Sequence, residues 1–297
     1  MRRREFLKKS LILIGGLGLS KFFRFSREIA EGGERTSEIF VAKGENPEEI
    51  TFRAVKGAGG IERFVKRGSK VVIKPNIAWN RRPEQAANTN PLVVKALVSM
   101  CKQAGASEVV VIDHTCNPWK VTYSVSGIKK CVEEAGGIMK PPSRYRKVYI
   151  SGTKILRSAE VLEEVLDADV VINVPVVKVH GSRARVTISM KNLMGVVKNR
   201  GFFHRTDLNR CIAEIAYYIK PPLTVIDATR ILLTRGPQGP GQVKETQIVA
   251  AGTDFVALDA FGTKLLGKNP EEVPHIQIAK EMGLGESDLS KIKIRYV

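Results

Sequence analysis

Cysteine is scarce in this chain of 297 residues, and its spacing excludes the common cysteine-based metal sites. The four cysteines stand at positions 101, 116, 131 and 211, and no two of them form a C-x-x-C pair. Ferredoxin-type clusters and the common zinc modules need closely spaced cysteines, so the chain encodes neither. Cys101 and Cys131 fall in helical patterns and are expected to be buried apolar residues. Cys116 follows a predicted strand end, which makes it the one cysteine to consider as a ligand or a reactive thiol.

Aromatic residues are also few, at 6% of the chain. Because nucleic-acid surfaces combine basic and aromatic side chains, and no nucleic-acid module is recognisable, we expect no nucleic-acid partner. The net charge of +18 therefore favours another kind of anion, either a small molecule or an anionic surface. Residues 1–30 contribute +6 of this charge and the rest of the chain +12. Charge that serves general solubility is the alternative interpretation.

No apolar run is long enough to cross a bilayer as a helix. The N-terminal run Leu11–Leu19 has nine residues and follows RREFLK, which begins at Arg3 and Arg4. A basic segment with twin arginines before a short apolar run is typical of a twin-arginine export signal. We therefore predict that residues 1–30 direct export to the periplasm or another extracytoplasmic space. No A-x-A cleavage site precedes Glu31, so retention of residues 1–25 as a membrane attachment is the alternative.

Strand and helix patterns alternate through the remainder, residues 31–297, and predict a single large α/β domain. The predicted strands are Val71–Ile73, Val109–Ile112, Val170–Ile172, Leu223–Ile226 and Ile248–Ala251. The predicted helices span residues 91–105, 127–136, 159–169, 209–222 and 254–267. Strands that are apolar throughout and separated by helices indicate a mostly parallel sheet with helices on both faces.

Polar side chains gather where these predicted strands end. The strand ends carry Lys74, Asn76, Asp113, Asn173 and Asp227. Ligands of parallel sheets bind beyond the carboxyl ends of the strands, so we expect these residues to open onto one crevice.

Two acidic residues further along the chain have structural interpretations. Asp254 precedes the last predicted helix and is expected to be its N-cap. Asp259 has apolar neighbours on the same helix and is expected to be the buried partner of a basic residue.

The segment Pro175–Lys198 holds the densest group of chemically active side chains. Its lysines and neutral polar residues could hold a phosphate or carboxylate group together with the strand-end residues. The predicted ligand-binding residues are Lys74, Asn76, Lys178, Thr187, Lys191, Asn192 and Asp227. Each of these residues alone would be interpreted as a solvated residue or a helix cap. The prediction therefore depends on several of them lying at one crevice.

His180 is the predicted catalytic residue, with Asp113 and His204 as its companions. Histidine titrates near neutrality and is the commonest metal ligand, so both proton transfer and binding of a divalent metal are open. Nearby lysines would favour the neutral imidazole, which is the form that a base or a metal ligand needs.

Five segments of the chain together resemble the family known as domain of unknown function 362. They are VVIKPNI, VVVIDHT, DVVINVPVVKVH with MKNLMGVV, VIDATRILLTRGPQGPG and TDFVALDAFGTKLLG. The resemblance covers about residues 70–290 and implies an α/β architecture and a site, without a reaction. Some members of that family carry ferredoxin-type cysteine motifs, which this chain lacks. An iron–sulfur role would therefore require a redox partner protein or ligands other than cysteine.

A second similarity is to the nickel-pincer lactate racemase family. The order of Asp113-His114-Thr115, His180, Lys191 and His204 is similar to that of the family's metal, cofactor and acid–base residues. This resemblance implies a racemase- or isomerase-like enzyme. The family's arginine and its glycine-rich lysine segment are missing, and Asn192 follows the lysine instead.

These observations leave two classes of function. The first is an exported enzyme that acts on a small anionic substrate, with a metal or another cofactor. The second is a non-catalytic protein that binds an anionic ligand or assists a redox partner.

Overall fold

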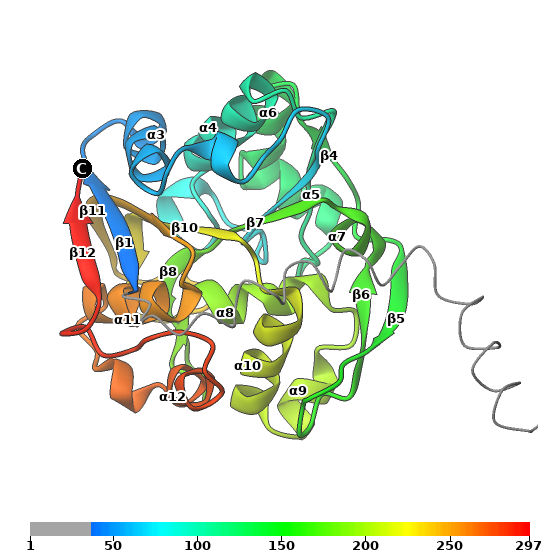
Figure 1. The fold of residues 1–297 in the computed structure, drawn as a ribbon, viewed down its shortest axis with the longest axis vertical. Coiled ribbons are helices and arrows are strands. Elements are labelled where there is room, and N and C mark those ends of the chain that lie inside the picture. The colour runs from blue at the N-terminus through cyan, green and yellow to red at the C-terminus, as the bar shows by residue number, and fades with distance from the viewer. Residues whose placement is uncertain (1–36) are drawn as a thin grey trace, which may run out of the picture. The chain divides into compact units, whose positions relative to one another are not determined.

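A ten-stranded mixed sheet forms the centre of the computed structural model, which describes residues 37–297 (Figure 1). Along the sheet its main strands are β12 (Lys293–Tyr296), β1 (Glu38–Lys43), β11 (Val243–Gly252), β10 (Leu223–Leu232), β7 (Val170–Val174), β2 (Lys70–Pro75), β3 (Glu108–Val111) and β4 (Ile138–Met139). Two short strands extend it: β8 (Val176–Val179) pairs with β10, and β9 (Val186–Thr187) pairs with β8.

The middle of the sheet is parallel, as the buried apolar strands predict. Strands β10, β7, β2, β3 and β4 are neighbours, and each pair runs in the same direction. Strand β11 is antiparallel to both β10 and β1, which makes the sheet mixed. Because β10, β7, β2 and β3 are consecutive and parallel, their carboxyl ends lie along one edge.

Helices cover both faces of this sheet, so the predicted α/β fold class is confirmed (Figure 1). One buried core contains Ile50 of α3 (Pro47–Gly57), Val94 of α4 (Pro91–Gln103) and Val132 of α6 (Ile128–Glu134). The other contains Ile212 of α10 (Leu208–Ile219) and Leu258 of α11 (Phe255–Leu265), together with α12 (Pro274–Glu281). Because helices pack against both faces of the sheet, polar side chains can reach a ligand only at the ends of the strands.

Side-chain caps set the first residue of several helices. Asp254 accepts hydrogen bonds from the backbone N–H groups of Val256 and Ala257, which confirms its predicted role as the N-cap of α11. Asn90 caps α4 and Asp207 caps α10 in the same way. Such caps pair backbone donors that the helix itself leaves without partners.

The predicted helix at 159–169 is wrong over its first half. Strand β6 (Ser158–Leu162) pairs antiparallel with β5 (Tyr145–Tyr149) in a separate two-stranded hairpin, and only α7 (Glu163–Asp167) is helical. The carboxylate of Glu214 accepts hydrogen bonds from the backbone of Lys154, Ile155 and Leu156 in the hairpin loop. Pairing with the preceding strand of the hairpin overrides the local helical pattern.

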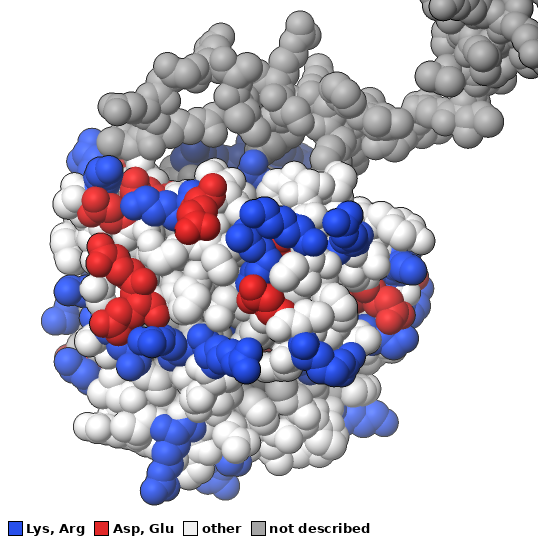
Figure 2. Space-filling view, turned by 90° about the horizontal axis from the view of Figure 1, so that it is seen from below, with Lys and Arg blue, Asp and Glu red and all other residues white. Residues whose placement is uncertain are grey.

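The predicted export signal at residues 1–30, with its alternative of membrane attachment through residues 1–25, lies outside the described residues. Within residues 37–297 no helix is both long enough and apolar enough to span a membrane. Figure 2 shows one face of the molecule, on which Lys and Arg side chains are spread among Asp and Glu side chains. On that face the positive charge is therefore dispersed.

Candidate functional site

A cavity of about 560 Å³ lies at the carboxyl ends of the parallel strands. We call it the lysine cavity. It is lined by Lys74, Asn76, Ala78, Trp79, Asp113, Cys116, Lys178, His180, Thr187, Lys191, Asn192, Met194, Gly195, Lys198, Asn199, Arg200, Gly201, His204 and Pro237. This set contains five Lys or Arg side chains and one carboxylate. The structure thus brings nine of the ten predicted site residues to one cavity.

Asn192 organises the polar groups on the inner wall of the cavity. It lies at the end of α8 (Ser189–Asn192) and is buried. Its amide donates to the Lys74 carbonyl at 3.1 Å and to Asn173 Oδ1 at 2.8 Å. Its Oδ1 accepts from Lys74 Nζ at 2.8 Å and from Asn76 Nδ2 at 3.0 Å. These four bonds use both N–H donors of the amide and both lone pairs of its oxygen. Asn192 therefore positions its neighbours and has little capacity left for a ligand.

Lys74 and Asp113 form a buried ion pair, with Nζ 2.9 Å from Oδ1. Burial lowers the pKa of Lys74, and the neighbouring Asp113 carboxylate opposes this effect. The other carboxylate oxygen of Asp113 accepts the backbone N–H of Ile77 at 2.6 Å. Gly195 passes so close to the pair that a Cβ on it would lie 1.9 Å from Asp113 Oδ1. The backbone of Gly195 therefore covers the ion pair, and only glycine fits there.

Lys178 and Lys191 are buried without an acidic partner among the described residues. Lys178 Nζ donates to Asn76 Oδ1 at 3.1 Å and to the Ala87 carbonyl at 2.5 Å. Lys191 Nζ contacts Met194 Sδ at 3.4 Å, and it has no oxygen partner within residues 37–297. Burial lowers the pKa of Lys178 to about 7 and that of Lys191 to about 8. A bound anion would stabilise the charged form of both lysines.

His180 follows β8 and is held by its own loop. Its Nδ1 accepts the backbone N–H of Ser182 at 3.0 Å, which assigns the proton of the neutral ring to Nε2. Burial, with the charges of Lys191 and Lys178, lowers the pKa of His180 to about 3. The neutral imidazole expected from the sequence is thus favoured. In this tautomer the ring carries its hydrogen-bond donor at Nε2.

The two predicted companions of His180 differ in their availability. His204 lies on α9 (Gly201–Arg205) and is exposed at the cavity, where burial lowers its pKa. Asp113 is occupied by Lys74 and Ile77, and no hydrogen bond joins it to His180 in the described part of the chain. The cooperation of His180 with Asp113 therefore stays a prediction.

Asp227 is held by hydrogen bonds within the protein, and its predicted contact with a ligand stays a prediction. It lies on β10 outside the cavity lining. Its carboxylate accepts from the backbone N–H groups of Asn90 and Thr229 at 2.7 and 2.9 Å, and from the Thr229 hydroxyl at 2.6 Å. The carboxylate therefore fastens the start of α4 to the sheet. Asn173, another strand-end residue, is turned toward Asn192 and Ser189.

Asp259 holds the helix that presents the third buried lysine. Its carboxylate accepts the backbone N–H groups of Ser189 and Met190, the first residues of α8. The expectation of a basic partner is therefore wrong, because helix N-terminal donors satisfy the carboxylate instead. Burial raises the pKa of Asp259 to about 7. This contact fixes the position of Lys191 and Asn192 on α8.

Arg200 is a cavity residue that no single motif indicated. Its guanidinium donates to the carbonyls of His114 and Thr115 at 2.9 and 3.0 Å, and to Cys116 Sγ at 3.6 Å. It thereby ties the segment after β3 to the start of α9. The only sequence signal was its place in a stretch rich in basic residues, from Arg183 to Arg205.

The described residues contain no cluster of side chains that could serve as metal ligands. Among residues 37–297, no cluster of three or more His, Cys, Asp or Glu side chains could hold a metal ion. The lysines that surround the cavity would also repel a divalent cation. The described lining of the cavity is therefore rich in positively charged side chains.

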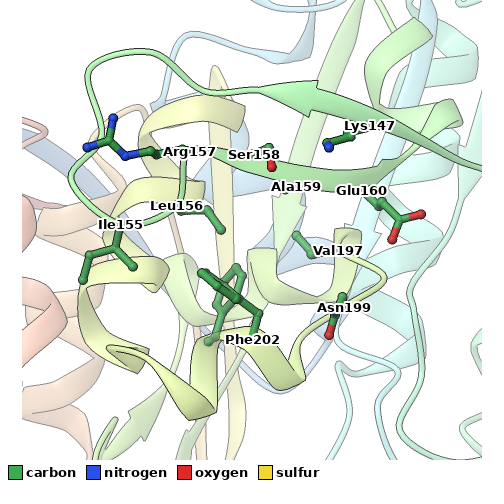
Figure 3. A pocket seen from close by; sticks show the side chains of 11 residues that line it. Lys147, Ile155, Leu156, Arg157, Ser158, Ala159, Glu160, Val197, Asn199 and Phe202 are labelled. Atoms are coloured by element: carbon green, nitrogen blue, oxygen red, sulfur yellow. The ribbon is translucent and has the colours of Figure 1, made fainter.

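A second cavity, of about 460 Å³, lies between the β5–β6 hairpin and α9 (Figure 3). Leu156, Val197 and Phe202 contribute apolar side chains to its lining. Its acidic residue Glu160 already pairs with Lys198 at 3.1 Å, and no buried charge lines it. It therefore offers no comparable chemistry.

The comparisons with known proteins decide the family. Residues 71–264 match the family described as Domain of unknown function (DUF362). This chain belongs to that family. The matched region includes every residue that lines the lysine cavity, so the cavity lies within the family's domain.

Two further proteins are similar to this member of the DUF362 family. The Thylakoid-associated protein sll1697 of Synechocystis sp. is 29% identical over 242 residues, which cover 76% of this chain and 72% of that protein. The lactate racemase apoprotein from Thermoanaerobacterium thermosaccharolyticum superposes with a TM-score of 0.45 and 11% identity. That match covers 79% of this chain and 58% of the racemase chain.

Proposed function

We propose that the lysine cavity binds a small anion that carries phosphate or carboxylate groups, and that the protein acts on this ligand as an enzyme. The proposal depends on the surroundings of Lys191. Its ammonium group is buried at the cavity, and no oxygen within the described range accepts a hydrogen bond from it. Burying a charge without a partner is costly, and an anionic ligand would offset that cost.

The enzymatic part of the proposal is supported by the titratable groups. His180, Lys178 and Lys191 line one cavity, and their pKa values are all lowered. Clusters of perturbed groups in a cavity are typical of active sites. A non-catalytic anion-binding protein, or an accessory to a redox partner, is the alternative. Recovery of a bound ligand unchanged after long incubation would favour the alternative, and conversion of the ligand, including racemisation or isomerisation, would favour an enzyme.

Replacement of Lys191 tests the proposed binding. Lys191→Met keeps the length of the side chain and removes its charge and donors. A hydrogen bond to a charged group contributes about 1.5–3 kcal/mol, so the affinity for sulfate, phosphate or oxalate should fall at least about tenfold. Isothermal titration calorimetry measures the affinity directly. Lys129→Met, at an exposed position of α6, is the matched control and should bind as the unmodified protein does.

Equal anion affinity in Lys191→Met and Lys129→Met would contradict the proposal. Unfolding by denaturant should be measured for both variants. Removing a buried charge that has no partner should not lower the stability of Lys191→Met. A loss of binding in a folded Lys191→Met protein therefore reports on the cavity.

We also propose that the protein is exported by the twin-arginine route and associates with a membrane. Arg3 and Arg4 with the following apolar run support export. The relative from Synechocystis is named as thylakoid-associated, which supports a membrane location. Replacing Arg3 and Arg4 together by lysine should leave a folded protein inside the cytoplasm. Fractionation of cells that express both forms tests this, and equal export of the double variant would remove the twin-arginine interpretation.

A further inference from the structure

We infer that Cys116 is a nucleophilic thiol at the lysine cavity, placed to form a covalent bond with an electrophilic carbon of the bound anion. The inference rests on the proposed function, since the anion-binding lysines bring the electrophile to the thiol.

Cys116 differs from the other three cysteines in its surroundings. It is exposed, lines the lysine cavity and accepts a hydrogen bond from Arg200 Nη1 at 3.6 Å. Cys101 and Cys211 are buried, and Cys131 is partly buried on α6, outside the cavity lining. Burial raises the pKa of Cys101 to about 12 and also raises the pKa of Cys131 and Cys211. Accessibility and a neighbouring guanidinium thus distinguish Cys116.

The surroundings of Cys116 are electropositive. Lys74, Lys178, Lys191, Lys198 and Arg200 line the same cavity as Cys116, and Asp113 supplies the one carboxylate of that lining. Reactive cysteines lie in accessible, electropositive surroundings of this kind. The same field also attracts a negatively charged reagent and raises its local concentration.

Two further side chains indicate that a ligand occupies the space next to the thiol. Thr187 is 4% exposed and lines the cavity, and its hydroxyl has no hydrogen-bond partner among the residues that the structure describes. Lys191 Nζ lacks an oxygen partner at the same cavity. A phosphate or carboxylate group could accept a hydrogen bond from both. The electrophilic carbon attached to that group would then lie within the cavity that Cys116 lines.

The covalent step is a displacement. The thiol of Cys116 first loses its proton to solvent. Its sulfur then forms a bond to the carbon of the ligand, while the bond from that carbon to its leaving group breaks. The leaving group departs with the electron pair. Iodoacetate is the simplest probe of this chemistry, because it joins a carboxylate to an electrophilic carbon and releases iodide.

The test compares alkylation by iodoacetate with alkylation by neutral iodoacetamide. The rate at each cysteine is measured by quenching, digestion and mass spectrometry of the full-length protein. For Cys116, the ratio of the iodoacetate rate to the iodoacetamide rate should be at least about tenfold higher in the folded protein than in urea. Each ratio compares two reagents at one thiol, so differences in accessibility and thiolate fraction cancel. Cys131 serves as the internal control and should show no such gain.

Two variants connect the preference to the cavity. Thr187→Val and Lys191→Met should each reduce the iodoacetate preference at Cys116, whereas Lys129→Met should not. Excess sulfate should protect Cys116 from iodoacetate in the unmodified protein. Equal reagent ratios at Cys116 and Cys131 in the folded, unmodified protein would overturn the inference without reference to any variant.

This experiment separates the inference from the proposed function. If calorimetry shows that sulfate binds but Cys116 shows no preference for iodoacetate, the inference fails and the binding proposal stands. If sulfate, phosphate and oxalate all fail to bind, the proposed function fails. The inference about Cys116 then fails with it, because it requires the bound anion.

Discussion

Replacing Gly195 by alanine should destabilise both the fold and the site, because the backbone of Gly195 covers the Lys74–Asp113 ion pair. The added Cβ would lie 1.9 Å from Asp113 Oδ1, 2.5 Å from Lys74 Nζ and 2.8 Å from Lys74 Cε. These distances are far inside van der Waals contact, so the carboxylate or the ammonium group must move. The carboxylate is also held by the backbone N–H of Ile77, and Lys74 by Asn192. Neither group can retreat without losing a buried partner.

The magnitude follows from two known effects. Overpacking a buried site costs about 1–3 kcal/mol, and breaking a buried ion pair by losing one partner costs about 3–5 kcal/mol. Since the pair would be displaced and not deleted, we expect Gly195→Ala to lose about 2–4 kcal/mol of unfolding free energy. Each kcal/mol lowers the melting temperature of a chain of this size by about 2–3 °C, so a decrease of about 5–10 °C should be seen.

Denaturant and thermal unfolding, followed by circular dichroism, measure this loss. Gly181→Ala is the matched control, since its Cβ would lie 3.4 Å from the Gly236 carbonyl, an ordinary contact. The control should unfold close to the unmodified protein. If Gly195→Ala proved as stable as Gly181→Ala and bound sulfate equally well, the close approach to the ion pair would not be a constraint.

Two other predictions concern pH and the hairpin. Sulfate affinity should be highest below about pH 7 and fall as the pH rises through 8, because Lys178 and Lys191 lose their protons with pKa values of about 7 and about 8 in the empty cavity. Sulfate keeps its charge over this range, so an affinity that is constant from pH 6 to pH 9 would contradict the role of these lysines. Glu214→Ala should cost about 1–3 kcal/mol, because it leaves backbone donors of the hairpin loop without a partner. Limited proteolysis should then cut within residues 150–157, and an unchanged cleavage pattern would count against that role.

The fold class could be read from the sequence because it depends on local patterns. Apolar runs such as Val71–Ile73 alternate with helical segments, and this pattern is typical of a parallel sheet covered on both faces. The segment 159–169 shows the limit of this reasoning. Its helical pattern yields to strand pairing with β5, and pairing partners 9 to 17 residues away are not visible in the segment itself.

The candidate site was partly predictable for a similar reason. Parallel strands place their carboxyl ends along one edge, so Lys74 and Lys178 could be assigned to a common site before their contacts were known. The direction in which each side chain points could not be predicted from the sequence. Asp227 lies inside the sheet and holds Asn90, and the amide of Asn192 is filled by its neighbours. These outcomes depend on pairs of residues more than one hundred positions apart.

Composition, periodicity and motif spacing were enough to establish an α/β chain with a positively charged strand edge and a twin-arginine motif. These properties are carried by neighbouring residues, whose order is visible along the chain. The assembly of the lysine cavity belongs to the folded state. Asp259 on α11 sets the start of α8, Arg200 joins two loops, and Cys116 lines the same cavity as the lysines. Burial, pKa shifts and the lack of an acidic partner for Lys178 and Lys191 within residues 37–297 arise from packing in three dimensions, so no local pattern of residues could have shown them.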